Sequence, residues 1–322
     1  MAPRFLAAAL VALALVPAHA GARGPAKAAS LATDERGAER ALAQLRRLEG
    51  GRGVRTGREA THALRELALR LPALDGPERR DGESRLARPT DRGGDPFGDG
   101  YPAEAPVARI CRSNICVHYV TSGAFADAPP GGLSYANQVL ETLEEVQSVE
   151  QGQLGWRAPS ADGGLGGGPE IDAYVKQLGG QGIFGYAATD PGQGGNSRHG
   201  FLVLDNDYTP SEFPGYASPL DPLRVTAAHE YNHLSHYAID TLQDFWLFES
   251  SAVWMEDRVY DAVDDYLNYL PPPRWTTQTR IPLTRFNASN GADPGNIKVY
   301  GSAVWNHWLA ARFGPQAVRS TW

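Results

Sequence analysis

The chain of 322 residues is long enough for one large domain or two modest ones, and its 42% hydrophobic and 21% charged residues are ordinary globular usage. Its formal net charge of −7 is unevenly spread: residues 1–105 carry 17 Lys and Arg against 14 Asp and Glu, whereas residues 106–322 carry 13 against 23. The net negative charge of residues 106–322, the body of the chain, argues against nucleic acid or an anionic membrane surface as the main partner.

The first twenty residues, MAPRFLAAALVALALVPAHA, have the pattern of a secretory signal peptide. Arg4 precedes an apolar run from Phe5 to Val16, and the small residues Ala18 and Ala20 form a cleavage site. A membrane anchor is the weaker interpretation because the apolar run is too short to span hydrocarbon. No later segment is long and apolar enough to cross a membrane, so we expect a secreted protein.

Residues 34–48 and 58–71 each carry Ala and Leu at helical spacing, and the glycine-rich stretch EGGRGVRTG lies between them. This pattern predicts a helical hairpin with charged outer faces, within a prosegment over residues 21–72. Residues 73–105 hold almost no large apolar side chains, which predicts a disordered linker. Signal, hairpin, linker and a body over 106–322 form the layout of a pro-enzyme, and a dispensable spacer is the alternative.

The only two cysteines, Cys111 and Cys116, lie in the strand-like stretch 107–121 and bracket a tight turn. In an exported protein a pair this close in sequence is expected to form a local disulfide. A zinc site is the rival interpretation, but a structural zinc site needs four ligands and no histidine pair lies nearby.

The body continues with a predicted helix over residues 134–155, a glycine-rich loop over 161–168, the strand EIDAYV and a strand over 200–205. The glycine-rich loop is not a phosphate cradle, since a strand follows it and no Gly-Lys-Ser/Thr does. After residue 205 the chain turns helical. Strands first and helices later are typical of the α+β class.

Three of the chain's 8 histidines fall within TAAHEYNHLSHYAID, residues 226–240. His229, Glu230 and His233 fit the pattern H-E-x-x-H, and positions i and i+4 of a helix lie one turn apart on the same side. The two imidazoles can therefore close on one small cation such as Zn²⁺. Glu230 sits beside that metal, within reach of a metal-bound water, which is the position of a general base.

This helix is expected to begin at Asp221, a natural N-cap, and a second helix is expected over residues 245–258, FWLFESSAVWMEDR. Glu249 lies in an otherwise apolar stretch, where a carboxylate costs free energy unless it is paired or bound to metal. Glu256 follows seven residues later on the same face. Two histidines, one glutamate and a water make a catalytic zinc site with one open position.

HEYNH followed by Glu249 in FESSAVWMED resembles the gluzincin metallopeptidases, among them thermolysin, aminopeptidase N and the bacterial collagenases. With VYGSAVWNHWLAARFG added, the pattern is more specifically similar to secreted bacterial metallopeptidases related to immune inhibitor A. The resemblance covers residues 106–322 and is sharpest from residue 200 onward. It implies an α+β, zincin-like domain with an N-terminal mixed sheet, the H-E-x-x-H helix and a mainly helical C-terminal part.

The resemblance also assigns roles. It makes Glu249 the third zinc ligand and Glu256 a carboxylate that orients a ligating histidine. It gives Tyr300 the position of a tyrosine that steadies the oxyanion, for which an ordinary core tyrosine is the alternative. The aminopeptidase signature Gly-x-Met-Glu-Asn is absent, which favours internal cleavage. Relatives continue beyond the position of Trp322, so the chain could be truncated at its C-terminus.

His236 lies on the same helix face as His229 and His233. Residues i and i+7 are about 10.5 Å apart along a helix, so one small ion would be strained to bind both His229 and His236. The metzincin pattern requires a glycine at 236 and a histidine at 239, where this chain has His236 and Ile239. We therefore expect His236 at the rim of the site or holding a ligating histidine in place.

A calcium site is a further candidate. Asp205 and Asp207 follow the strand GFLVLD, and carboxylates in a loop suit Ca²⁺, which stabilises many exported enzymes. A plain Asx turn is the favoured alternative.

The sequence thus predicts a secreted zinc-dependent metalloendopeptidase made as a precursor, with one catalytic Zn²⁺ and a protein or peptide substrate. Three alternatives stay open. The first is an inactive peptidase-like module for binding or adhesion, the second a zinc hydrolase of non-peptide amides, and the third a purely structural zinc site, which would leave Glu230 without a task.

Overall fold

The computed structural model describes five stretches of the chain: residues 24–52, 56–91, 100–270, 280–287 and 293–322. The signal peptide predicted over residues 1–20 lies outside them. Within these stretches no helix combines the length and the apolar character needed to cross a membrane.

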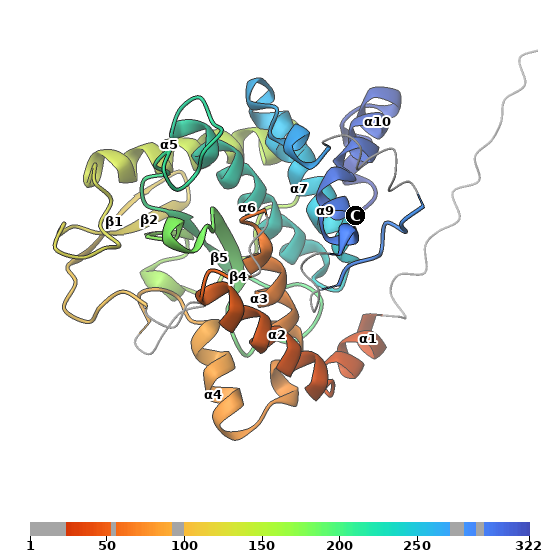
Figure 1. Cartoon of the computed structure of the whole chain (residues 1–322), viewed down its shortest axis with the longest axis horizontal. Helices are drawn as coiled ribbons and strands as arrows, with labels where there is room; N and C mark the ends of the chain where they lie inside the picture. The colour runs from red at the N-terminus through yellow and green to blue at the C-terminus, as the bar shows by residue number, and fades with distance from the viewer. Residues whose placement is uncertain (1–23, 53–55, 92–99, 271–279, 288–292) are drawn as a thin grey trace, which may run out of the picture.

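A five-stranded mixed sheet forms the centre of the body (Figure 1). Its strands are β1 (Val107–Arg112), β2 (Ile115–Val120), β3 (Ile171–Lys176), β4 (Gly185–Thr189) and β5 (Gly200–Asp205), in the spatial order β1-β2-β3-β5-β4. The three central strands are parallel, and both edge strands run antiparallel to their neighbours. The α+β class predicted from the sequence is confirmed, although β4 was not predicted because GYAAT has weak strand propensity.

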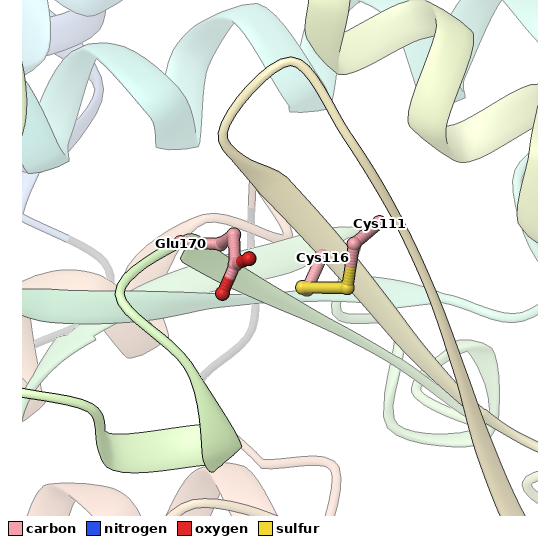
Figure 2. Close-up of side chains that lie close together, drawn as sticks. All are labelled: Cys111, Cys116 and Glu170. Atoms are coloured by element: carbon pink, nitrogen blue, oxygen red, sulfur yellow. A yellow bond between two sulfur atoms is a disulfide. The ribbon is translucent and has the colours of Figure 1, made fainter.

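The first hairpin of the sheet carries the predicted disulfide. Cys111 on β1 and Cys116 on β2 are paired in register, and their sulfurs are bonded (Figure 2). The carboxylate of Glu170 lies close to the two sulfurs. Metal ions bind thiolates, and both sulfurs here are already bonded to each other, so the pair offers no metal ligand.

Helices α5 (Leu133–Gln147) and α6 (Leu220–Asp240) cover one face of the sheet. Alternate strand residues point to them, because side chains along a strand alternate between the two faces. The buried cluster on this face includes Ile115, Val117, Ala173, Val175, Leu202, Leu204, Val139, Leu140, Leu143, Leu223, Ala227 and Tyr231. The helix predicted over 134–155 ends earlier than expected and continues as a π-helical turn, η3 (Ser148–Gln153).

Helices α2 (Glu35–Glu49) and α3 (Glu59–Arg70) cover the other face, as Figure 1 shows. The intervening strand residues pack against them in a second buried cluster, which includes Tyr174, Tyr186, Phe201, Val203, Leu42, Leu45, Leu64 and Leu67. The predicted helical hairpin is therefore present, and it forms the third layer of a helix–sheet–helix arrangement. The prediction that its charged residues face outward is wrong for Arg58 and Arg65, which are buried against the body.

The disordered linker predicted over residues 73–105 is wrong for its first part. Residues Gly76–Arg85 form helix α4, and Arg88 is buried against the sheet. The guanidinium of Arg88 pairs with Asp162 at 2.7 Å, with Asp190 at 2.7 Å and with Asp172. A sequence poor in large apolar residues is thus held in place by charge, which composition alone does not reveal.

The C-terminal part is helical, with α7 (Phe245–Val259), α9 (Pro294–Gly301), α10 (Ala303–Phe313) and the short α11 (Gln316–Arg319). A third buried cluster joins them, and its members include Trp156, Val253, Trp254, Met255, Tyr269, Val299, Tyr300 and Val318. In the described stretches the remaining helical elements are α1 (Gly24–Leu31) and the short turns η2 (Leu71–Ala73), η4 (Leu165–Gly167), η5 (Gly179–Gln181), η6 (Asp261–Val263) and η7 (Asp265–Tyr269).

Replacing Arg88 by methionine should destabilise the fold strongly. The substitution keeps much of the side-chain volume but leaves three buried carboxylates without their cation, which costs about 3–5 kcal/mol in comparable cases. Denaturant unfolding of Arg88→Met and wild type measures the difference in the free energy of unfolding. Arg46→Met is the control: Arg46 pairs with Asp81 at 2.6 Å, but its side chain is 53% exposed, so about 1 kcal/mol or less should be lost. Equal losses in the two variants would contradict this account.

Candidate metal centre

Helix α6 carries the H-E-x-x-H residues in its buried middle. Its first residue is Leu220, and Asp221 lies in the first turn instead of capping the helix as predicted. The Asp221 carboxylate accepts a hydrogen bond from the backbone N–H of Ser218 at 3.1 Å. From residue 225 to 238 every side chain of the helix is buried between the sheet, α5 and α7. Such burial holds His229 and His233 in fixed positions.

His229, His233 and Glu249 meet in one place. The Nε2 atom of His229 lies 3.1 Å from one carboxylate oxygen of Glu249, and Nε2 of His233 lies 3.6 Å from the other. One ligand atom from each of the three residues lies within 4.8 Å of the others, which is close enough to hold a single metal ion. All three side chains are at most 1% exposed.

These residues fit a bound metal ion on chemical grounds. Among the described residues, no donor or acceptor forms a hydrogen bond with Nε2 of His233, although this atom is buried. Burial lowers the pKa of His229 well below its ordinary value and that of His233 to about 3, so both imidazoles are neutral, the form that binds metal. Burial raises the pKa of Glu249, and a cation at this point would keep its carboxylate charged.

Each histidine is also held from behind. The Nδ1 atom of His229 lies 2.5 Å from a carboxylate oxygen of Glu256. A carboxylate on one ring nitrogen fixes the proton there and leaves the other nitrogen, Nε2, free to bind a metal. Glu256 therefore has the geometry expected for a residue that orients His229.

His236 is placed behind His233. Its Nδ1 lies 3.3 Å from Nδ1 of His233, and its Nε2 lies 3.2 Å from the hydroxyl of Ser251. The ring of His236 stacks on Trp322, with ring centres 3.9 Å apart and planes 5° apart. His236 does not belong to the metal-sized group, which we define as His229, His233 and Glu249, the three residues close enough together to hold one metal ion. This placement agrees with a role in holding His233.

Glu230 contacts helix α3. The hydroxyl of Thr61 donates a hydrogen bond to Glu230 at 2.8 Å and accepts one from the backbone N–H of Ala187 at 3.0 Å. Burial raises the pKa of Glu230 to about 7, against the opposing charge of Arg58 and the Thr61 hydrogen bond. A carboxyl group with that pKa can accept and return a proton near neutral pH.

Tyr300, on α9, is buried and lies close to the metal-sized group. Its ring stacks on Tyr269 with ring centres 5.3 Å apart. Burial, and then the negative charges of Glu249 and Glu59, raise the pKa of Tyr300 well above its ordinary value. The hydroxyl therefore stays protonated and can donate a hydrogen bond.

Three residues of the N-terminal segment reach this centre and were not predicted from the sequence: Arg58, Thr61 and Arg65. Arg65 donates hydrogen bonds to the carbonyl oxygens of Thr241, at 2.8 Å, and Gln243, and lies over the ring of Phe248. The three residues recur at spacings of three and four, so Thr61 and Arg65 form a polar stripe on α3 that continues to Arg58, the residue before the helix. The polar stripe is the sequence signal that could have identified these residues, but the solvent-exposed face of any surface helix shows the same pattern.

The candidate calcium residues, Asp205 and Asp207, lie near Glu212. The two oxygens of Asp205, however, accept four backbone N–H groups, from Leu178 and Gly179 and from Asp207 and Tyr208. These hydrogen bonds explain the buried carboxylate as a backbone-ordering turn without a metal ion.

Comparisons with protein-family models, with curated proteins and with solved structures found no match to this chain. The function must therefore be inferred from the site itself.

The purified protein should bind one equivalent of a divalent metal such as zinc. His233→Ala removes one of two neutral nitrogen ligands and should abolish stoichiometric binding. His236→Ala leaves the ligands intact but removes support for His233, so the affinity should fall by about 10- to 100-fold. Metal analysis after dialysis, together with competition titration against a chelator, measures both. His199→Ala, a histidine that instead pairs with Asp190 at 2.8 Å, is the control; a loss of zinc there equal to that in His233→Ala would argue against this centre.

Proposed function

We propose that this protein is a secreted zinc-dependent metalloendopeptidase with a zincin-like domain. The observation that carries the proposal is the buried group of His229, His233 and Glu249, with the carboxylate of Glu230 next to it on the same helix. Two neutral imidazoles and one carboxylate, with Glu230 left over, suit a catalytic zinc site better than a structural one, which a fourth protein ligand normally closes.

His229, His233 and Glu249 would hold the zinc ion. When bound, zinc supplies Lewis-acid chemistry, lowering the pKa of water and polarising a carbonyl group. The softness of the donors supports the choice of metal, since imidazole suits zinc and purely oxygen-based sites suit magnesium or calcium. Glu256 and His236 fix the orientation of the two ligating rings.

Glu230 moves the proton. It takes a proton from the attacking water and passes it to the amine of the departing peptide, for which a pKa of about 7 is well matched. Tyr300, which stays protonated, donates a hydrogen bond to the negative charge that develops on the carbonyl oxygen. The surrounding burial excludes bulk water and strengthens both interactions.

Glu230→Gln should retain zinc and lose hydrolysis. The amide keeps the size of the side chain and a hydrogen-bond partner for Thr61 but cannot take up a proton, and a positioned general base contributes about 100- to 10,000-fold. Hydrolysis of a peptide mixture derived from casein, followed by mass spectrometry, measures the loss, and metal analysis checks the zinc. Wild-type rates in the zinc-loaded variant would contradict the mechanism. Asp207→Asn removes a carboxylate that does not belong to the group of His229, His233 and Glu249, and serves as the control.

The leading alternatives are distinguished by the same assays. A binding or adhesion module would hold zinc but hydrolyse no peptide under any condition. A hydrolase of non-peptide amides would lose its activity in Glu230→Gln yet leave casein peptides intact. A panel of peptides and small amides therefore separates the three classes.

We further propose that the full-length chain is latent. Helix α3 lies along β4, and the hydroxyl of Thr61 on α3 donates a hydrogen bond to the carboxylate of Glu230. The metal-sized group is almost fully buried, and Thr61 of α3 is bonded to Glu230 beside it, so we infer that the first turns of α3 move when a peptide binds. Because α2 and α3 also cover one face of the sheet, a local displacement of residues 56–66 is a smaller change than loss of the whole hairpin.

Arg65→Ala should raise the activity of the full-length protein. The variant removes two hydrogen bonds that tie α3 to the turn after α6, worth roughly 1.5–3 kcal/mol each when the donor is charged. If activity scales with the open population, it should rise by about tenfold or more. Initial rates on the casein peptides test this, with Arg46→Ala on the exposed side of α2 as the control. An unchanged or lower rate in folded Arg65→Ala would argue against latency.

A further inference from the structure

Arg58, at the start of α3, fills a pocket made by the body. Its guanidinium nitrogens lie 3.1 Å from the hydroxyl of Tyr269, 3.4 Å from a carboxylate oxygen of Asp265 and 3.5 Å from one of Glu256. The guanidinium carbon lies 5.5 Å from the centre of the Phe184 ring. The side chain is 1% exposed. A planar cation is thus held by two acids, a phenol and an aromatic ring.

The pocket is acidic. The carboxylates of Glu256 and Asp265 are each 1% exposed, and both face the guanidinium of Arg58. Two buried carboxylates left without a cation are costly, so the pocket favours a positively charged occupant. Asp265 is held in place by Tyr216, whose hydroxyl donates to it at 2.7 Å, and by Asn268 at 3.0 Å. The acids are therefore fixed independently of Arg58.

The pocket adjoins the metal centre. The same oxygen of Glu256 that faces Arg58 lies 2.5 Å from Nδ1 of His229. Only the His229 ring therefore separates the pocket from the proposed zinc position. A side chain bound in the pocket would belong to a residue close to the scissile bond.

The chain on either side of Arg58 contacts β4 and the residue just before it. The carbonyl oxygen of Gly57 accepts a hydrogen bond from the backbone N–H of Phe184 at 3.0 Å, just before β4 begins. Three residues after Arg58, Thr61 accepts from the N–H of Ala187 within β4. β4 is an edge strand, so a peptide could add to it and take the N–H of Ala187 in place of Thr61 once α3 moves.

A cavity leads to Asp265, one of the two acids. It has a volume of about 280 Å³, and its walls include Phe184, Tyr216, Asp265 and Tyr269. Thr56, two residues before Arg58, lines it as well. The space beside Arg58 is therefore already shaped for a long side chain and carries a carboxylate.

We propose that the pocket formed by Asp265, Glu256 and Tyr269 is a substrate subsite that binds an arginine or lysine side chain next to the scissile bond, and that Arg58 occupies it in place of the substrate. The proposal rests on the proposed function in taking the substrate to be a peptide. The enzyme would then cleave peptides next to an arginine or lysine residue, and residues 56–61 would take the place of the substrate in this structure.

Ligand binding tests the subsite without any need for activity. In full-length Arg58→Ala the pocket is vacated, and acetyl-arginine amide should bind at least about tenfold more tightly than acetyl-citrulline amide, which has the same shape without the charge. Calorimetry or NMR titration measures both. Adding Asp265→Asn should remove the preference, whereas adding Asp261→Asn, at an exposed carboxylate in the preceding turn, should leave it unchanged. Equal affinities for the two amides would overturn the proposal, and so would no binding of either to the folded variant.

If Arg58→Ala does not fold, a measurement on the chain with Arg58 intact decides. A second measurement is the cleavage profile of a proteome-derived peptide library treated with the active protein. Arg and Lys should be enriched at one position beside the cut, and Asp265→Asn should reduce that enrichment at least about tenfold. Efficient cleavage without basic enrichment would overturn the subsite and leave the peptidase assignment intact. Absence of cleavage under all conditions would count against the peptidase assignment, while the titrations would still decide whether the pocket prefers a cationic side chain.

Discussion

Burying His229, His233 and Glu249 against one another removes three polar groups from water, and the rest of the structure is arranged around that cost. A buried carboxylate and two neutral imidazoles are stable together when a cation satisfies them. Glu256 and His236 hold the rings from behind, so that their Nε2 atoms converge on Glu249. Helices α6 and α7 must therefore pack in one register, and the sheet beneath them supplies the rigid surface on which they do so.

The N-terminal segment meets this acidic body through buried arginines. Arg58 faces Asp265 and Glu256, Arg65 faces the turn after α6, and Arg88 faces three aspartates. The basic N-terminal part of the sequence and its acidic body thus contact each other through specific pairs of charged and polar groups. Such pairs are sensitive to the loss of one partner, since a lone buried charge is costly. These pairs fix the position of the N-terminal segment over the candidate metal centre. The apolar contacts of α2 and α3 with the sheet make the segment a structural layer of the fold as well.

The local patterns predicted much of this arrangement. The spacing of H-E-x-x-H placed His229 and His233 on one face, and an acid in an apolar helix pointed to Glu249. The outcome follows from helix geometry, which acts over a few residues. The contact between Thr61 and Glu230 spans 169 residues, and no local pattern encodes it. The linker prediction was wrong around Arg88 for the same reason: its partners lie on distant segments, and composition records only that the stretch is polar.

The central claim is that the imidazoles of His229 and His233 and the carboxylate of Glu249 hold zinc in the interior of the protein. X-ray absorption spectroscopy at the zinc edge, on the full-length protein after removal of loosely bound metal, tests it most directly. The account predicts one zinc per chain with imidazole nitrogen and oxygen neighbours at about 2.0–2.2 Å and no sulfur. A protein that retains no zinc, or a spectrum without imidazole neighbours, would contradict it.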